Sequence, residues 1–259
     1  RSLPPRLPRE ESRWVHLPLR SQASEFYRVN VLLFADNQRA GDRFLLSPAQ
    51  TQHVHTVLKA KNGDRLRIGA INGFLGQGIL LDNESVQIED LSTPPPKKID
   101  VDIILALPRP KNLRRCVRAL ANYGVQNIHI VHSYRVEKAY WQSPLLETPV
   151  MHQALLDGLE IAGDSVLPNL QFHRYFKPFV EDFASKLQHE RKLVTAKDGA
   201  NDWQQLRASR STIVAIGPEG GFLPYETELF QANGFESINL GARILSVENA
   251  LSAVCAFAL

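Results

Sequence analysis

Ile216-Gly217-Pro218-Glu219-Gly220-Gly221-Phe222 lies where an apolar run, which begins at Thr212, ends in a glycine-rich turn. A helical pattern begins near Tyr225, so the segment predicts a strand, a turn and a helix in direct succession. Glycine lets a ligand approach the backbone closely. The turn has neither the Lys-Ser or Lys-Thr pair of a phosphate-binding P-loop nor the spacing of the dinucleotide-binding fingerprint. It indicates either a ligand loop of another kind or an ordinary turn.

The alternation of strands and helices continues on both sides of this segment. The predicted strands are 101–107, 127–132 and 192–196, and the predicted helices are 111–123 and 148–163. Nearly continuous apolar strands are typical of a parallel sheet covered on both faces, so the fold class is α/β. Ligands of open α/β sheets bind at the carboxyl ends of the strands, which points to the loops that start near Ala196, Gly217 and Leu240.

The N-terminal third has a different pattern. Residues 1–25 are rich in Pro, Arg, Ser and Glu without apolar periodicity, which indicates an extended arm or a targeting remnant. Residues 26–92 contain short apolar runs separated by turn residues, which predicts a small β-barrel or sandwich with one helix that starts at Ser47-Pro48. Three prolines within 93–98 remove backbone donors and fix φ, so this segment is the predicted linker to a second domain at 99–259.

Composition places the chain among ordinary globular proteins, and its length of 259 residues favours two domains. Cys116 and Cys255 are too few for a disulfide framework, and no Cys or His spacing is that of a zinc site, so we expect no metal and a reducing compartment. No apolar run is long enough to span a bilayer. We expect a cytoplasmic protein without membrane association, or an organellar one if the arm is a transit remnant.

Basic residues gather at 109–118, although the net charge of the chain is only +3. No acidic residue interrupts this segment, so it has the charge density to neutralise several phosphates of an RNA. The alternative is a solvated helix face. The basic residues are Arg109, Lys111, Arg114, Arg115 and Arg118.

A second segment makes a resemblance to a known family specific. Asn239-Leu240-Gly241-Ala242-Arg243-Ile244-Leu245-Ser246-Val247-Glu248-Asn249-Ala250 follows the next predicted strand. Together with 216–222, it resembles the signature of the RsmE family of SPOUT-class RNA methyltransferases. The likeness runs from about residue 27 to residue 259, with further matches at Ala106-Leu107-Pro108, Tyr123-Gly124-Val125, Ser133, Arg135, Glu160 and Pro168.

The resemblance implies an enzyme that methylates the uracil ring nitrogen N3 in 16S ribosomal RNA, with S-adenosylmethionine as cofactor. It also implies a PUA-like β-barrel at 26–92, a SPOUT domain with a trefoil knot at 99–259, and a homodimer that acts on ribosomal RNA or the small ribosomal subunit. By position, the expected cofactor contacts are Thr195, Ala196, Gly217, Pro218, Glu219, Gly220, Gly221, Leu240, Gly241, Ile244, Leu245 and Ser246.

Methyl transfer to uracil N3 requires removal of its proton and stabilisation of the charge left on the ring. Arg243 is the candidate for that stabilisation, because it lies in an expected cofactor loop and stays charged; a phosphate or dimer contact is the alternative. Glu219 is the candidate for attracting the sulfonium cation or relaying the proton, and the alternative is a cap of the following helix. Neither cysteine is required for this chemistry.

Several polar positions depart from the usual family pattern. Ser-Glu-Arg becomes Ser133-Tyr134-Arg135, and Arg-Thr-Glu-Thr becomes Ser246-Val247-Glu248-Asn249. These changes leave two alternatives open: a noncatalytic RNA-binding assembly factor on the same fold, and a SPOUT methyltransferase that acts on a different base.

Overall fold

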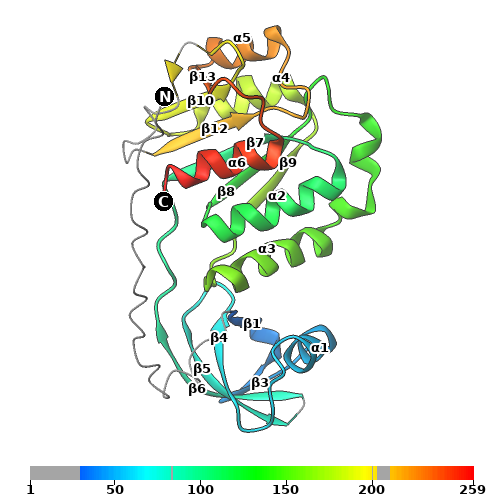
Figure 1. The fold of residues 1–259 in the computed structure, drawn as a ribbon, viewed down its shortest axis with the longest axis vertical. Helices are drawn as coiled ribbons and strands as arrows, with labels where there is room; N and C mark the ends of the chain where they lie inside the picture. The colour runs from blue at the N-terminus through cyan, green and yellow to red at the C-terminus, as the bar shows by residue number, and fades with distance from the viewer. Residues whose placement is uncertain (1–29, 83, 200, 203–210) are drawn as a thin grey trace, which may run out of the picture.

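The computed structural model describes residues 30–82, 84–199, 201–202 and 211–259, which form a smaller and a larger β-sheet (Figure 1). The arm expected at 1–25 lies outside the described residues.

The smaller sheet has six strands in the order β1-β4-β5-β6-β3-β2. Adjacent strands of this sheet are antiparallel, except for β1 and β4, which are parallel. Phe34 and Phe44 stack at its centre with ring centroids 4.2 Å apart. The strands are β1 (Leu32–Phe34), β2 (Arg39–Ala40), β3 (Arg43–Leu45), β4 (Arg65–Ala70), β5 (Leu75–Asp82) and β6 (Ser85–Thr93).

One helix, α1 (Pro48–Thr56), accompanies this sheet, and it begins where the sequence predicts. The Ser47 hydroxyl accepts a hydrogen bond from Gln50 N, and the Gln50 side chain accepts one from Ser47 N at 2.9 Å. This reciprocal cap satisfies two backbone donors that would otherwise have no partner at the helix start.

The larger sheet has seven strands in the order β11-β13-β10-β12-β7-β8-β9, and every neighbouring pair is parallel. This arrangement confirms the α/β prediction. The strands are β7 (Val101–Ala106), β8 (Asn127–Val131), β9 (Asn169–His173), β10 (Arg191–Thr195), β11 (Asn201–Asp202), β12 (Thr212–Ile216) and β13 (Glu236–Asn239).

Three helices pack together on one face of the larger sheet. Figure 1 shows α2 (Pro110–Tyr123) and α6 (Val247–Ala256) crossing this face, with α3 (Thr148–Ala162) against α2 and towards the smaller sheet. Gly124 and Gly163 end α2 and α3 with φ of +80° and +68°, as predicted for glycine after a helix. Helix α3 begins at Thr148, as predicted, and Glu147 takes the capping position.

The segment after β9 packs on a buried histidine, His129. The short helix α4 (Phe176–Pro178) continues into a π-helical turn at Phe179–Phe183. Its aromatic rings pack around His129, and burial lowers the pKa of this histidine to about 4. His129 is therefore an uncharged residue of the interior at neutral pH.

Residues near Glu160 and Asp164 join the two sheets. Val31 N donates to Glu160 O at 3.0 Å, and Leu33 N donates to the Glu160 carboxylate at 3.3 Å. Lys98, at the end of the proline-rich connection, donates to Asp164 at 2.7 Å. The prolines at 94–96 have no regular structure, but β6 reaches Thr93, one residue into the expected linker. The connection is therefore held at both ends.

Candidate active site

Three loops meet at the carboxyl edge of the larger sheet because β13, β10 and β12 are neighbours. Ala196 N donates to Ile238 O at 2.9 Å, and the Thr195 hydroxyl donates to Ala215 O at 3.1 Å. The side-chain amide of Asn239 donates from Nδ2 to Lys197 O at 2.5 Å. The carboxyl ends of β10, β12 and β13, from which the three loops start, are therefore tied to one another, as expected from their places on a parallel sheet.

The 217–221 loop is shaped by two glycines with different requirements. A Cβ at Gly217 would lie 2.8 Å from Phe222 N, so the backbone packs too closely there for any side chain. Gly221 has a φ of +69°, and its N–H donates to Pro218 O at 2.7 Å. The turn presents Glu219 and Gly220 to solvent, while Gly217 and Pro218 are buried.

The 240–246 loop is largely exposed. Gly241 has a φ of +110°, and its N–H donates to the Asn239 side chain at 2.8 Å. Ile244 is 86% exposed, whereas Leu245 packs against the core. Ser246 caps α6, because its hydroxyl accepts from Asn249 N at 3.3 Å. Two of the expected cofactor contacts, Leu245 and Ser246, thus also have structural roles.

A fourth segment, after β8, braces the glycine-rich loop. Arg135 donates from Nη1 to Gly220 O, and its side chain lies where a Cβ at Gly220 would be. Glu226, on α5 (Pro224–Ala232), is fully buried and accepts from Tyr134 N and Leu223 N, each at 2.8 Å. Glu226 was not among the predicted site residues. Glu226 lies three residues after Leu223, as the glutamate of a capping box does, but leucine has no side-chain oxygen to complete the box, so the sequence contains only half of that signal.

Glu219 lies at the start of α2. Its Oε1 accepts from Arg109 N at 3.3 Å, and Arg109 is the residue that precedes α2. The alternative role of Glu219 as a cap of the following helix is wrong, because Leu223 and Glu226 form the start of α5. A carboxylate is favoured near the amino end of α2 by the helix dipole.

Arg243 is exposed in the 240–246 loop. Among the described residues, no hydrogen bond or ion pair joins it to Glu219, the other catalytic candidate. The structure therefore places both candidates on loops at one edge of the sheet without bringing them into contact.

All five residues of the basic segment are exposed, but they are not equivalent. Arg114 Nη2 lies 3.6 Å from Asp157 Oδ2 on α3. Lys111, Arg115 and Arg118 follow helical spacing on the side of α2 opposite its buried stripe. The stripe includes Cys116, and burial raises the pKa of its thiol to about 12, which agrees with a packing role.

The described part of the chain contains neither a metal-binding cluster nor a membrane-spanning helix. Within it, no group of three or more His, Cys, Asp or Glu side chains is arranged to hold a metal ion. Every helix there is too short or too polar to cross a membrane.

Comparison with known proteins links this geometry to a family. A family model described as an RNA methyltransferase domain matches residues 95–259. The ribosomal RNA small subunit methyltransferase E of Treponema pallidum is 28% identical over 246 residues, which cover 89% of this chain and 91% of that protein.

Solved structures agree on the fold. A Legionella pneumophila protein in complex with the cofactor SAM aligns with a TM-score of 0.71 at 23% identity, covering 89% of this chain and 96% of its own. Ribosomal RNA small subunit methyltransferase E from Neisseria gonorrhoeae, bound to S-adenosyl methionine, aligns with a TM-score of 0.68 at 18% identity over 88% and 96% of the two chains. The order of strands and helices described above is thus shared along most of the chain.

Proposed function

Because this chain belongs to the RNA methyltransferase family, we propose that it transfers a methyl group from S-adenosylmethionine to N3 of a uridine in small-subunit ribosomal RNA. The observation that carries the proposal is that three loops start from hydrogen-bonded strand ends at the carboxyl edge of the parallel sheet. The Treponema pallidum relative, matched over nearly its whole length, supports ribosomal RNA as the substrate class.

The loops suit a cofactor that is read through the backbone. Gly220 and Gly241 are exposed and carry no side chain, so a ligand can approach their backbone closely. We assign the cofactor to Thr195 and Ala196, to residues 217–221, and to Leu240, Gly241, Ile244, Leu245 and Ser246. When bound, S-adenosylmethionine supplies a methyl group made electrophilic by its sulfonium centre.

The protein's own groups handle the uracil. Loss of the N3 proton leaves negative charge on the ring oxygens, and Arg243 stabilises that charge because its guanidinium remains protonated. Glu219 accepts the proton or attracts the cationic cofactor. Its contact with Arg109 N supports this assignment, because the hydrogen bond fixes the carboxylate beside the glycine-rich loop.

The finer architecture is also part of the proposal. We divide the chain into a PUA-like barrel at 26–92, a linker at 93–98 and a SPOUT domain at 99–259. The six-stranded sheet with its own apolar core supports the first unit. A trefoil knot is supported by the path of the C-terminal segment, since β13 lies beyond β10 while α6 returns to pack on β12 and α2. We also propose a homodimer.

The test is methylation of 16S ribosomal RNA, as naked RNA and as small subunits, followed by nucleotide-resolution mapping of the product. A new methyl group on N3 of one uridine supports the proposal. Methylation of another base would replace the uridine assignment, and S-adenosylmethionine binding without any transfer would favour the noncatalytic assembly factor. A Gly217→Ala variant is the matched negative control, because its added Cβ distorts the central loop.

A further inference from the structure

An aromatic pocket lies at the same edge of the sheet as the candidate active site, beyond the loop that follows β8. It has a volume of about 310 Å³ and is lined by Trp141, Gln142, Ser143, Pro144, Leu146, Glu147, Phe172 and Arg174. The sequence prediction used none of these residues. They come from two 3-10 turns (Lys138–Gln142 and Pro144–Leu146), the start of α3 and the end of β9.

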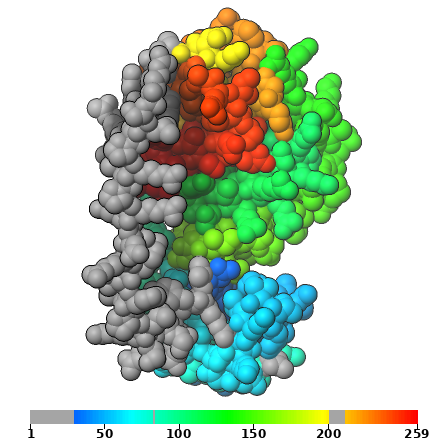
Figure 2. Space-filling model, in the orientation of Figure 1, coloured from blue at the N-terminus to red at the C-terminus, as the bar shows by residue number. Residues whose placement is uncertain are grey.

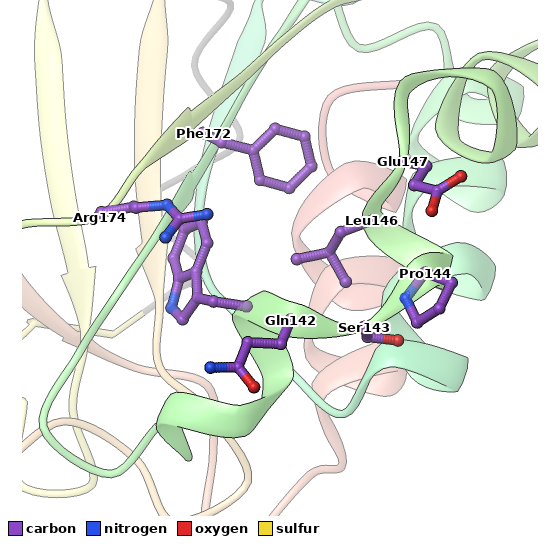
Figure 3. A pocket seen from close by; sticks show the side chains of 8 residues that line it. Gln142, Ser143, Pro144, Leu146, Glu147, Phe172 and Arg174 are labelled. Carbon is purple, nitrogen blue, oxygen red and sulfur yellow. The ribbon is translucent and has the colours of Figure 1, made fainter.

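Two aromatic rings and Leu146 form the apolar part of the wall, and Trp141 is held in place. Trp141 and Phe172 meet edge to face with ring centroids 6.2 Å apart. The indole N–H donates to His132 Nδ1 at 2.8 Å, which fixes the plane of the ring. Burial, together with the nearby charge of Lys138, lowers the pKa of His132, so its Nδ1 remains an acceptor at neutral pH. Figure 3 shows the Phe172 and Leu146 side chains pointing into one space from opposite sides.

An arginine lines the pocket, and exposed tyrosines lie in the loops after the two nearby strands. The Arg174 guanidinium lies over the Trp141 ring, 5.3 Å from its centroid. Tyr134 and Tyr175, in the loops after β8 and β9, are 72% and 74% exposed. Phe172 is 37% exposed although it is a large apolar residue. Exposed aromatic rings beside arginine are the groups on which proteins stack the bases of unpaired RNA.

The position of the pocket suits a substrate strand. Neighbouring strands lie about 4.8 Å apart, so the end of β9 is only about 14 Å from that of β12, three strands away. Arg109 and Arg135, both exposed, follow the strands between them. An RNA backbone that passes from the 217–221 loop towards β9 would therefore meet arginines first and the aromatic pocket next.

We propose that this pocket receives an unpaired base of the RNA substrate a few nucleotides from the methylated one, with Phe172 and Trp141 as apolar walls and Arg174 as the stacking cation. The inference rests on the proposed function for the identity of the substrate. Its test measures binding and not methyl transfer, so the two proposals fail separately.

The test uses Trp141 as its own reporter. With Trp14 and Trp203 replaced by Phe, Trp141 is the remaining tryptophan. A short single-stranded RNA oligonucleotide should quench its emission, and an abasic oligonucleotide of the same length should not. Phe172→Ala and Arg174→Gln should each weaken RNA binding roughly 5- to 100-fold, the usual loss for one stacked base, and leave S-adenosylmethionine affinity unchanged.

Two matched variants act as controls. Ile161→Ala removes an apolar side chain that is also 37% exposed, and Lys186→Gln removes an exposed cation elsewhere on the domain. Both should bind RNA like the parent. Unchanged RNA affinity in Phe172→Ala and Arg174→Gln, with no change in Trp141 emission, would overturn the proposal.

Discussion

Glu160 is a carboxylic acid placed between the two sheets, where the smaller sheet covers it. Burial raises its pKa from 4.5 to about 7, although the hydrogen bond from Leu33 N acts in the opposite direction. The folded protein therefore holds the Glu160 proton more tightly than the unfolded chain does. The proton on Glu160 therefore stabilises the folded state fully below pH 4.5. This stabilisation declines as the pH rises and is lost above pH 7.

Glu160→Gln should remove that loss. Glutamine keeps an oxygen that can accept from Leu33 N, and it has no charge to bury. We expect the free energy of unfolding to rise by roughly 1–3 kcal/mol at pH 8 and to change little at pH 5, as measured by urea unfolding. Glu228→Gln, at an exposed position on α5, should show no such difference. Equal effects of Glu160→Gln at both pH values would contradict the assignment.

Gly217 permits the close backbone packing on which the 217–221 loop depends. Gly217→Ala should reduce S-adenosylmethionine affinity at least tenfold in calorimetry, because its Cβ would lie 2.8 Å from Phe222 N and 3.0 Å from the Gly221 backbone. Gly234→Ala is the control: it too strains a glycine turn, here through a φ of +86°, but Gly234 lies between α5 and β13. Parent-like cofactor affinity in Gly217→Ala would remove the loop from the binding site.

At the scale of single elements, α2 presents cations that differ in their surroundings. Replacing Lys111, Arg115 and Arg118 with Gln should weaken RNA binding and lower the slope of log affinity against log salt by about 0.7–0.9 for each lost phosphate contact. S-adenosylmethionine affinity should not change, because these side chains lie away from the buried stripe of the helix.

Arg114→Gln is the informative comparison. Asp157 already partly balances Arg114, so its loss should alter the salt slope less than the loss of Arg115. If the triple variant kept the parental affinity and slope, the cations of α2 would be a solvated face, and the RNA surface would have to lie elsewhere.

Elements with strong local signals were predictable from the sequence. Ser47-Pro48 marks the start of α1, and Gly124 and Gly163 mark the ends of α2 and α3, because caps depend on nearest neighbours. The π-helical turn at Phe179–Phe183 was not predicted, because its phenylalanine rings pack against His129 on β8, which is distant in the sequence. The pairing of Arg114 with Asp157 likewise depends on how α2 packs against α3.

At the scale of the molecule, the sequence predicted which loops would meet but not what braces them. Parallel strand order brings the loops after β10, β12 and β13 to one edge, and hydrophobic patterns were enough to expect that. The hydrogen bonds from Arg135 to Gly220 O and from Tyr134 N to Glu226 join segments about 90 residues apart. Such contacts follow from the three-dimensional path of the chain, which local patterns do not specify. Cofactor binding by these loops stays a prediction.

The surface around α6 combines small and exposed apolar side chains, which concerns whether two copies of the chain associate. One side of this helix is buried, through Val247, Leu251 and Val254, whereas Ala256 faces solvent and Ser252 and Ala253 are half-buried. Figure 2 shows the C-terminal segment, in red, on the same face as α2, in green. Ile244 and Leu259, at 86% and 79% exposed, flank this helix with apolar surface. Small side chains beside exposed apolar ones are suited to close packing with a second copy.

We therefore expect sedimentation velocity to show a homodimer at micromolar concentration. Ala256→Arg should shift it to a monomer, because a long charged side chain would be buried without a partner in the interface. Methylation should fall with dimer content, since the exposed 240–246 loop leads directly into α6 and would lie beside the partner. Ala232→Arg, at the exposed end of α5, should leave both properties unchanged. A monomeric parent with full methyl transfer would show that one chain completes the site and that the apolar surface around α6 serves another purpose.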